Sequence, residues 1–368
     1  MRLLFLIPSL SGGGAERQLS LIAPEMARRG HEVHVCFTSA GSNPQPLLEA
    51  GIRATQLSRR NNYDPRLLFQ IQKTISESEI DVIQTWMLQM DILGGLAAAV
   101  NRIPWVLREP TNLEGHPEFV KSLVRRVVAV SAAAVVANSQ GGIAYWQSQP
   151  FPQKRFLITN AVPLSEIENT VPWKDGFLGI ASEQKVVLSA GRFHPHKNLS
   201  NLLSALEHLL ADSTVSVMLC GDGPELGAVK AWIGARGLSS RIVCPGYIAD
   251  IWPHMKRADA FVSVSFLEGQ PNAVLEAMAC ECPLVVSDIP AHRSFLNAES
   301  ALLVNPHDPH AIALALKNVL NDRVAAKRRA AVAKEKTSSW SVASVANEYE
   351  KVYAAVLERS RRRVGRAR

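Results

Sequence analysis

The chain lacks any uninterrupted apolar run of the roughly 18 to 20 residues that a membrane-spanning helix requires. It also lacks the even cysteine count of a disulfide framework, since it has five cysteines in 368 residues. The apolar start, residues 1–8, is short for a signal peptide and is followed by glycines, so we interpret it as a buried strand. These observations lead us to expect a cytoplasmic protein with reduced thiols.

Outside its last ten residues the chain has almost no excess of basic over acidic residues. The net charge is +7, but six arginines lie between 359 and 368, and without them 34 basic residues face 33 acidic ones. A nearly neutral body argues against a nucleic-acid partner. The arginine tail is a contact either for anionic lipid or for nucleic acid, or it is a solvated end. The predicted helix at 118–130, with basic residues beside valines and leucines, is either a membrane contact or an ordinary half-buried helix.

Short apolar runs alternate with amphipathic stretches along the whole chain, which is typical of parallel α/β sheets. In the first half we predict strands near residues 3–7, 32–37, 82–84, 105–107, 134–137 and 155–158, and helices near 16–29, 91–100 and 118–130. In the second half we predict strands near residues 185–189, 215–219, 241–244 and 260–264, and helices near 199–210 and 225–235.

This alternation and the chain length predict two Rossmann-like domains. The first covers residues 1–165 and the second covers residues 185–340. Residues 166–184 are the expected linker, because prolines, glycines and acidic residues there follow no sustained period. A final helix over residues 341–359 has an apolar face that we expect to pack back on the first domain, before a basic tail at 360–368.

Two basic residues lie in the loop after the first predicted strand of the second domain. Arg192 follows Gly191, and Lys197 lies just before a helix. The carboxyl end of such a strand opens into the crevice where doubly wound sheets bind ligands. An arginine fork and a lysine charge can neutralise a diphosphate there, although exposed basic loops are also common. His194 and His196 in the same loop lack a third ligand, which favours a solvated loop over a metal site.

Two glutamates accompany a later strand, loop and helix. Glu268 lies in the loop, and Glu276 lies more than a turn inside the helix. Pro271 suits the first turn of that helix, whose free N–H groups form an anion site. An unpaired carboxylate among apolar neighbours is costly, so we expect Glu276 to bind a partner. Two carboxylates so placed can hold different parts of one extended ligand.

A glycine run from Gly12 to Gly14 follows the first strand of the first domain. Glycines let a backbone approach a phosphate or a sugar closely, with the next helix N-terminus aimed at it. The run is not a dinucleotide fingerprint, because Arg17 occupies the third glycine position. It is not a Walker loop either, because no Gly-Lys-Ser/Thr follows.

Together these motifs resemble those of the retaining GT-B glycosyltransferases of family 4. The most specific match is the E-x7-E spacing of Glu268 and Glu276, followed by Ala-Met-Ala. The similarity covers essentially the whole chain except the tail, and implies the GT-B fold, with two Rossmann-like domains facing a central cleft. Further matching segments are residues 12–16, 158–162, 191–192 with 197–198, 220–224 and 283–288.

The resemblance implies a role for each matching residue. Arg192 and Lys197 would hold the donor diphosphate and stabilise its leaving charge, and Glu268 would contact the transferred sugar near its reacting end. Glu276 would bind the ribose. The glycine run would close over the diphosphate from the first domain. The other implied donor contacts are Gly13, Gly14, Gly191, Gly269, Gln270, Pro271 and Asn272, with Gly246, Tyr247 and Ile248 near the base.

The implied reaction moves a sugar, with retention, from a nucleotide-diphosphate donor to a saccharide or lipid-linked acceptor. UDP-sugars are favoured over GDP-sugars, the first domain binds the acceptor, and the product serves cell-surface polysaccharide or glycolipid biosynthesis. No D-x-D pair suits a metal-bridged diphosphate, so we expect neither a cofactor nor a metal. The expected location is the cytoplasm or the inner face of the plasma membrane. A sugar-nucleotide epimerase on the same fold and a non-catalytic sugar-nucleotide binder are the alternatives.

The sequence departs from the family pattern at two places. Glu281, after the helix that carries Glu276, occupies a position where relatives commonly have glycine. Relatives also carry a first-domain histidine near the donor sugar, and neither residues 84–87 nor residues 108–112 hold one. Candidates for sugar or acceptor contact are Arg108, Glu109, Asn112 and His116, of which the last is otherwise simply exposed.

Overall fold

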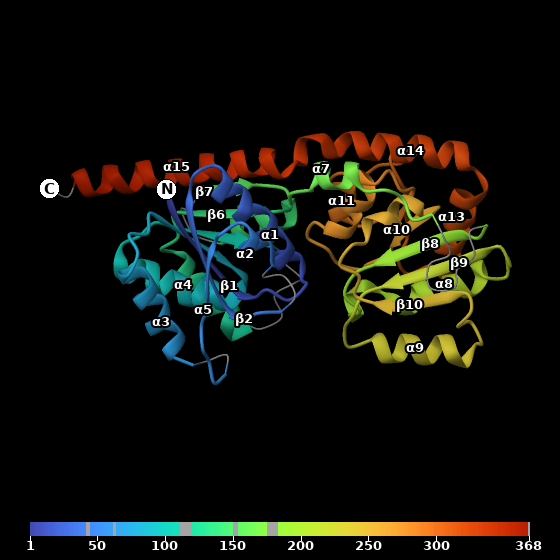
Figure 1. Ribbon diagram of the computed structural model, residues 1–368, viewed down its shortest axis with the longest axis horizontal. Coiled ribbons are helices and arrows are strands. Elements are labelled where there is room, and N and C mark those ends of the chain that lie inside the picture. The colour runs from blue at the N-terminus through green and yellow to red at the C-terminus, as the bar shows by residue number, and fades with distance from the viewer. Residues whose placement is uncertain (42–44, 62–63, 111–118, 150–153, 175–182, 367–368) are drawn as a thin grey trace. The chain divides into compact units, whose positions relative to one another are not determined.

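The computed structural model describes residues 1–368 apart from 42–44, 62–63, 111–118, 150–153, 175–182 and 367–368. The chain divides into two compact units (Figure 1). Unit 1 comprises residues 1–161 and 340–368, and unit 2 comprises residues 162–339. Each unit is built on a parallel sheet with crossover helices, which is the Rossmann-like arrangement that the alternating sequence predicts.

The described strands of unit 1 form one sheet in the order β3-β2-β1-β4-β5-β6-β7. These strands are β1 (Arg2–Ser9), β2 (Glu32–Ser39), β3 (Arg53–Gln56), β4 (Val82–Trp86), β5 (Trp105–Glu109), β6 (Ala134–Ala137) and β7 (Lys154–Leu157). The helices are α1 (Gly14–Arg28), α2 (Gln45–Glu49), α3 (Arg66–Ser76), α4 (Met87–Asn101), α5 (Phe119–Ala129), α6 (Gln140–Gln147) and α15 (Val342–Arg366). Strand order reverses between β1 and β4, which makes this the switch point of the sheet.

Different helices cover the two faces of this sheet. Side chains alternate along β1, so Phe5 packs on the face covered by α1 and α15, whereas Leu4 and Leu6 pack on the face covered by α3, α4 and α6. The buried residues Ala98 of α4 and Ala129 of α5 belong to the second face. Helices α3, α4 and α5 therefore lie on the side of the sheet opposite α15.

Helix α15 ends the chain but belongs to unit 1. Its Tyr353 hydroxyl donates to Oε1 of Gln84 at 2.6 Å, and its Glu350 pairs with Arg29 at 2.8 Å. The helix continues to Arg366, so the expected end of the helix at 359 is wrong and most of the basic tail is helical. An ion pair between Glu358 and Arg362, one turn apart, supports the extra turns.

The described strands of unit 2 form a sheet in the order β10-β9-β8-β11-β12-β13. These strands are β8 (Lys185–Ala190), β9 (Val215–Cys220), β10 (Ile242–Gly246), β11 (Ala260–Ser263), β12 (Leu284–Ser287) and β13 (Leu302–Val304). The helices are α7 (Leu164–Asn169), η3 (Pro195–Lys197), α8 (Leu199–Leu209), α9 (Leu226–Ala235), α10 (Trp252–Arg257), α11 (Asn272–Ala279), α12 (Pro290–Arg293), α13 (Pro309–Asn321), α14 (Arg323–Lys336) and η4 (Thr337–Trp340), the last ending at the start of the second segment of unit 1.

The expected linker at 166–184 begins inside helix α7. This helix belongs to unit 2, because Ile167 is buried and the ammonium of Lys256 donates to the carbonyl oxygen of Thr170 at 2.7 Å. Unit 1 ends at Ala161, before the expected boundary at 165. Residues 175–182 of the expected linker lie outside the described residues. No helix in the described part of the chain is both long and apolar enough to cross a membrane.

Candidate functional site

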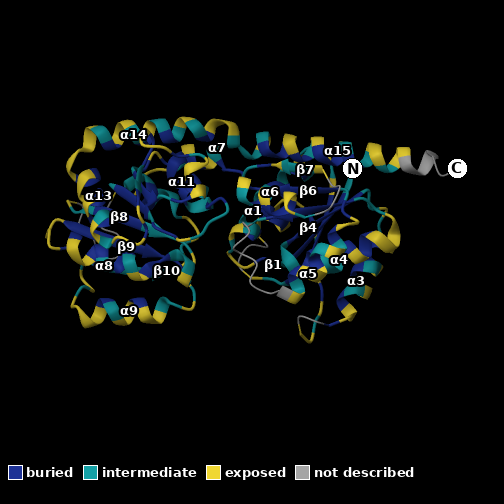
Figure 2. Cartoon of the chain, turned by 180° about the vertical axis from the view of Figure 1, so that it is seen from behind, coloured by how far each residue is buried: buried dark blue, intermediate teal, exposed yellow. Residues whose placement is uncertain are grey.

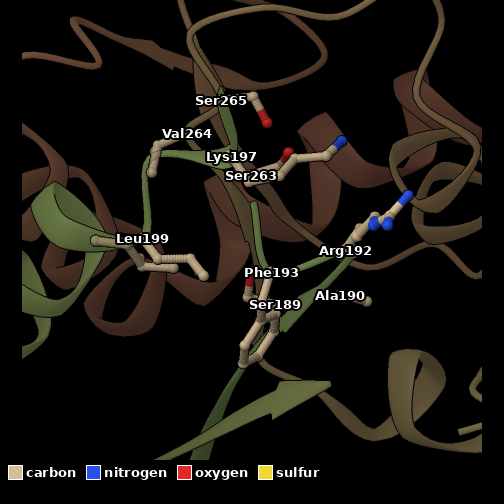
Figure 3. A pocket seen from close by; sticks show the side chains of 11 residues that line it. Ser189, Ala190, Arg192, Phe193, Lys197, Leu199, Ser263, Val264 and Ser265 are labelled. Atoms are coloured by element: carbon tan, nitrogen blue, oxygen red, sulfur yellow. The ribbon is translucent and has the colours of Figure 1, made fainter. Parts of the chain in front are cut away.

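The predicted basic loop and the loop of Glu268 meet at the switch point of unit 2. Strand order reverses between β8 and β11, so the connections that leave these strands diverge at the carboxyl edge of the sheet. Arg192 and Lys197 follow β8, and Glu268 follows β11. A pocket lies between the two loops (Figure 3). Its lining residues are Ser189, Ala190, Gly191, Arg192, Phe193, Lys197, Leu199, Leu202, Ser263, Val264 and Ser265.

Lys197 and Glu268 form an ion pair beside this pocket. The ammonium of Lys197 donates to Oε1 of Glu268 at 2.5 Å, and the hydroxyl of Ser265 donates to the same oxygen at 2.7 Å. Burial acts to raise the pKa of Glu268, but Lys197 and Ser265 outweigh it and hold the pKa below its ordinary value. Glu268 is therefore an ionised carboxylate with a fixed orientation.

Hydrogen bonds tie the two loops of the site together. Asn198 adopts left-handed backbone angles, φ 59° and ψ 42°, which asparagine tolerates better than most residues. Its buried side-chain amide donates to the carbonyl oxygens of Val264 at 2.9 Å and of Pro306 at 2.7 Å. The backbone N–H of Phe266 donates to the carbonyl oxygen of His196 at 2.8 Å. These bonds hold Lys197 and Glu268 at a constant separation.

Arg192 is exposed at the mouth of the pocket. Its guanidinium makes no hydrogen bond or ion pair with any residue that the structure describes. In Figure 3 the side chains of Arg192 and Lys197 extend toward the same side of the pocket. The arrangement offers two cations to an anion that binds there.

Glu276 is buried on α11 and has a partner that sequence analysis missed. The indole N–H of Trp252, the first residue of α10, donates to Oε2 of Glu276 at 2.7 Å. Pro271 occupies the N-cap of α11 and not its first turn, as was expected. Its ψ angle of 111° is extended, while its carbonyl oxygen accepts the first α-helical hydrogen bond, from the N–H of Leu275 at 3.2 Å.

The Cys-Gly-Asp-Gly-Pro segment, residues 220–224, supports the basic loop through its backbone. Gly221 and Gly223 have φ angles of +147° and +153°. A Cβ atom on Gly221 would lie 1.8 Å from the carbonyl oxygen of Gly191, and one on Gly223 would lie 2.3 Å from that of Phe193. Only glycine permits this approach, so the segment shapes the loop that carries Arg192.

The remaining donor contacts implied by the resemblance lie on the same edge of the sheet. Gly246 ends β10 with φ +84°, Tyr247 is exposed, and Ile248 is half-buried. Gln270 is buried in the loop of Glu268, between the half-buried Gly269 and the N-cap of α11, and Asn272 is the first residue of that helix. Their contact with a nucleotide stays a prediction.

His292 is a second residue that sequence analysis missed. It is fully buried on α12, and Nδ1 lies 2.7 Å from the carbonyl oxygen of Ser287, so Nδ1 carries the proton. Nε2 is buried without a hydrogen-bond partner among the described residues. Burial lowers the pKa of His292, although the hydrogen bond to the Ser287 carbonyl and the charge of Glu268 oppose this shift.

The glycine run of unit 1 lies at the switch point of its own sheet. Gly12 has φ +55°, Gly13 is the N-cap of α1, and Gly14 begins the helix. The buried Glu16 side chain turns back over this N-terminus, because a Cβ atom on Gly13 would lie 2.2 Å from its Oε2. The predicted contact between this run and a donor stays a prediction.

Arg108 and Glu109 are buried inside unit 1. The guanidinium of Arg108 donates to Oδ1 of Asn160 at 2.9 Å. Oε2 of Glu109 accepts hydrogen bonds from Arg125 at 2.7 Å and from the indole of Trp146 at 3.1 Å. The expected contact of these two residues with a sugar or acceptor stays a prediction. The other two candidates, Asn112 and His116, lie outside the described residues.

Metal-ligating side chains do not gather anywhere in the described part of the chain in groups of three or more. The rings of His194 and His196 lie 4.4 Å apart in the basic loop. Cys280 and Cys282 are free and buried, and burial raises the pKa of both thiols.

Two Rossmann-like units, with basic residues and glutamates at the switch point of the second, are the features of a GT-B glycosyltransferase. Comparison with known families agrees. The family model described as Glycosyltransferase Family 4 matches residues 12–166, and the model described as Glycosyl transferases group 1 matches residues 174–338. The chain belongs to glycosyltransferase family 4, and it is a hexosyltransferase-type enzyme.

Individual relatives span most of the chain. A UDP-Gal:alpha-D-GlcNAc-diphosphoundecaprenol alpha-1,3-galactosyltransferase of Escherichia coli is 25% identical over 277 residues, which cover 71% of this chain and 72% of the relative. A GalNAc-alpha-(1->4)-GalNAc-alpha-(1->3)-diNAcBac-PP-undecaprenol alpha-1,4-N-acetyl-D-galactosaminyltransferase of Campylobacter jejuni is 23% identical over 369 residues, 97% of this chain and 99% of the relative. Anabaena Alr3699/HepE, solved with UDP-glucose, has a TM-score of 0.87 at 22% identity and covers 96% of this chain and 100% of its own. The predicted fold and family are confirmed.

Proposed function

We propose that this enzyme moves a hexosyl or N-acetylhexosaminyl group from a UDP-sugar to a lipid-linked saccharide, with retention of configuration. The observation that carries the proposal is the Lys197–Glu268 ion pair at the switch point of unit 2, with Arg192 beside it. The two bacterial relatives are named for transfer onto diphosphoundecaprenol-linked acceptors, and the first is named for UDP-galactose. These names support a transferase over an epimerase or a non-catalytic binder.

The basic residues suit the donor diphosphate. The ammonium of Lys197 has three N–H donors, of which Glu268 takes one, so two remain for phosphate oxygens. Arg192 adds a planar fork for a second pair of oxygens. When the bond between the anomeric carbon and the β-phosphate oxygen breaks, negative charge builds up on that oxygen, and these two cations stabilise it. For this reason we propose that transfer needs no metal ion.

The glutamates suit the two ends of the donor. Glu268 shares an oxygen between Lys197 and Ser265, and this contact with a phosphate-binding lysine supports a role for its carboxylate where the sugar joins the phosphate. We propose that the acceptor hydroxyl attacks the same face from which the phosphate leaves, and that its proton passes to a β-phosphate oxygen. The Glu276 carboxylate, oriented by Trp252, accepts hydrogen bonds from ribose hydroxyls.

The acceptor also bears on location. A polyprenyl chain of the undecaprenol type is hydrocarbon, and it stays in a lipid bilayer. An enzyme that glycosylates its head must work beside the membrane surface. We therefore propose peripheral contact with the inner face of the plasma membrane, in the service of cell-surface polysaccharide or glycolipid synthesis.

The test is calorimetric titration of the full chain with UDP, GDP and their common sugars in EDTA. We expect UDP to bind without metal, and Glu276→Ala to weaken binding by at least about tenfold, since a charged hydrogen-bond acceptor is lost. Glu299→Ala removes an exposed carboxylate of the same unit and is the control. Absence of binding to any nucleotide, or equal binding by the two variants, would contradict the proposed site. Proton NMR of the product sugar's anomeric coupling then checks retention.

A further inference from the structure

Helix α5 of unit 1 buries a charged residue and exposes several aliphatic ones. Arg125 on its inner side is buried and pairs with Asp91 and Glu109, each at 2.7 Å. A helix at a water-exposed surface normally buries its apolar stripe and exposes its charges. Its outer side carries exposed aliphatic side chains instead: Val120, Leu123, Val124 and Val127.

Exposed apolar side chains continue from α5 onto α4 and α3. In Figures 1 and 2 these helices lie next to one another on one side of the sheet of unit 1. We call this area the α3–α5 surface. Its apolar residues, each between 41% and 72% exposed, are Phe69, Leu96, Val100, Val120, Leu123, Val124, Val127 and Val130. They are eight of the sixteen large apolar residues that are exposed in the described chain, so the α3–α5 surface concentrates such residues.

The α3–α5 surface exposes no acidic side chain from its three helices. Asp91 is the only acidic residue in their sequences, and it is fully buried. Glu77, just after α3, lies 3.7 Å from the ammonium of Lys73, which offsets its charge. The basic residues on or directly after the helices, besides the buried Arg125, are Arg66, Lys73, Arg102, Lys121 and Arg126. Arg66 pairs with Asp64, just before α3, at 2.5 Å. Basic residues therefore outnumber acidic ones around the exposed apolar residues.

We propose that the α3–α5 surface docks unit 1 on an anionic lipid bilayer. This inference rests on the proposed membrane contact, whereas the α3–α5 surface itself is defined only by the exposure and charge of its side chains. Aliphatic side chains enter the boundary between lipid headgroups and acyl chains, while long basic side chains reach the phosphates. A fluid bilayer requires no shape-complementary pocket, which suits side chains spread over three adjacent helices.

The arginines near the end of α15 are assigned no part in this docking. Helix α15 packs on the face of the sheet that contains Phe5, whereas α3 and α4 pack on the face that contains Leu4 and Leu6. The packed part of α15, which leads to this basic end, therefore belongs to the other layer of unit 1. The sequence offered two membrane contacts, the arginine tail and the helix at 118–130. We propose the second of these, with the contacting surface continuing from that helix onto α4 and α3.

Vesicle flotation with the full chain tests the proposal. We expect co-flotation with vesicles of phosphatidylcholine and phosphatidylglycerol, and much less with phosphatidylcholine alone. Val120→Ser with Val127→Ser should lower partitioning by about tenfold or more, because both side chains lose apolar area. Leu314→Ser with Val324→Ser removes two exposed apolar residues of unit 2 and should leave partitioning within about twofold.

Each variant is also titrated with UDP, so that loss of folding or of donor binding is separated from loss of docking. A native chain that binds UDP but no anionic vesicle would overturn the docking surface and the proposed membrane contact, and leave the proposed sugar transfer from a UDP-sugar standing. The proposal would also be overturned if the two serine pairs lowered vesicle partitioning equally. It would be overturned as well if the triple variant Arg359→Gln, Arg361→Gln and Arg362→Gln lost vesicle partitioning while Val120→Ser with Val127→Ser did not. A concentration-dependent dimer that the α5 variant abolishes, without vesicle binding by the native chain, would assign the surface to a second copy instead.

Discussion

The indole N–H of Trp252 donates to Oε2 of Glu276 across 2.7 Å, and both groups are held on short helices of unit 2. Trp252→Phe keeps an aromatic ring but removes this donor. We expect the dissociation constant for UDP to rise about tenfold, because a hydrogen bond to a charged group typically contributes about 1.5 to 3 kcal/mol. Calorimetry checks this value. Trp232→Phe, on a different helix of the same unit, is the control. An unchanged affinity of Trp252→Phe for UDP would show that the indole does not position Glu276.

The Lys197–Glu268 pair predicts a pH-dependent stability. The pKa of Glu268 lies below its ordinary value of 4.5, so the stability that its ionisation contributes is complete above 4.5 and is lost as the pH falls through the folded value. Lys197→Met leaves burial as the dominant influence and raises the pKa of Glu268. The variant should then lose about 1 to 3 kcal/mol more at pH 7 than at pH 4.5. Urea unfolding at both pH values measures the difference.

A second substitution tests that explanation. Lys197→Met combined with Glu268→Gln removes the buried carboxylate that the single variant leaves unpaired. The double variant should recover most of the stability lost at pH 7. If the single variant is equally destabilised at both pH values, the loss comes from packing and not from the charge of Glu268.

Glu281 predicts a gain in stability. It follows α11 with φ +58°, while its N–H and that of Cys282 donate back into the helix, to Met278 and Ala277, at 3.0 Å each. This is the position where helices prefer glycine, and a left-handed L-residue costs about 1 to 2 kcal/mol. Glu281→Gly forfeits only an exposed ion pair with Lys334, so we expect a gain of about 1 kcal/mol in the free energy of unfolding.

The control for this substitution is Glu281→Ala, which loses the ion pair but keeps the left-handed strain. Urea midpoints of the native chain and both variants give the comparison. A glycine variant no more stable than the alanine variant would contradict the prediction. The positive φ angle of Glu281 gives a physical reason why glycine suits this position.

Much of the fold could be predicted because buried parallel strands are apolar runs. The strand expected at residues 134–137 has those bounds in β6, and β1 extends its prediction by a residue or two at each end. Strand β3 could not be predicted, because Arg53–Gln56 contains no apolar run and is a strand only through its pairing with β2. Helix α6 begins Gln-Gly-Gly, so its sequence gives a weak helical signal.

In the functional site, too, only the features that lie within one local segment could be predicted. Arg192 and Lys197 share one loop, so their spacing could be recognised in the sequence. Trp252 comes from another element, and its hydrogen bond to Glu276 depends on tertiary packing that spacing does not encode. The burial of Glu109 could not be predicted either, because its buried partner lies on a later helix.

That partner, Arg125, serves two buried carboxylates, and the network predicts a further pH dependence. Burial raises the pKa of Asp91 to about 6, above its ordinary value of 3.8, although Arg125 and Thr85 oppose the shift. The stability linked to its protonation is therefore complete below 3.8 and is lost as the pH rises through about 6. Asp91→Asn removes this dependence of stability on pH. Its free energy of unfolding, relative to that of the native chain, should therefore rise by about 2 to 3 kcal/mol between pH 4 and pH 7. Urea unfolding across that range measures it, with the exposed Asp250→Asn as control. Parallel pH profiles for Asp91→Asn and the native chain would mean that Asp91 stays ionised throughout, with Arg125 compensating both carboxylates.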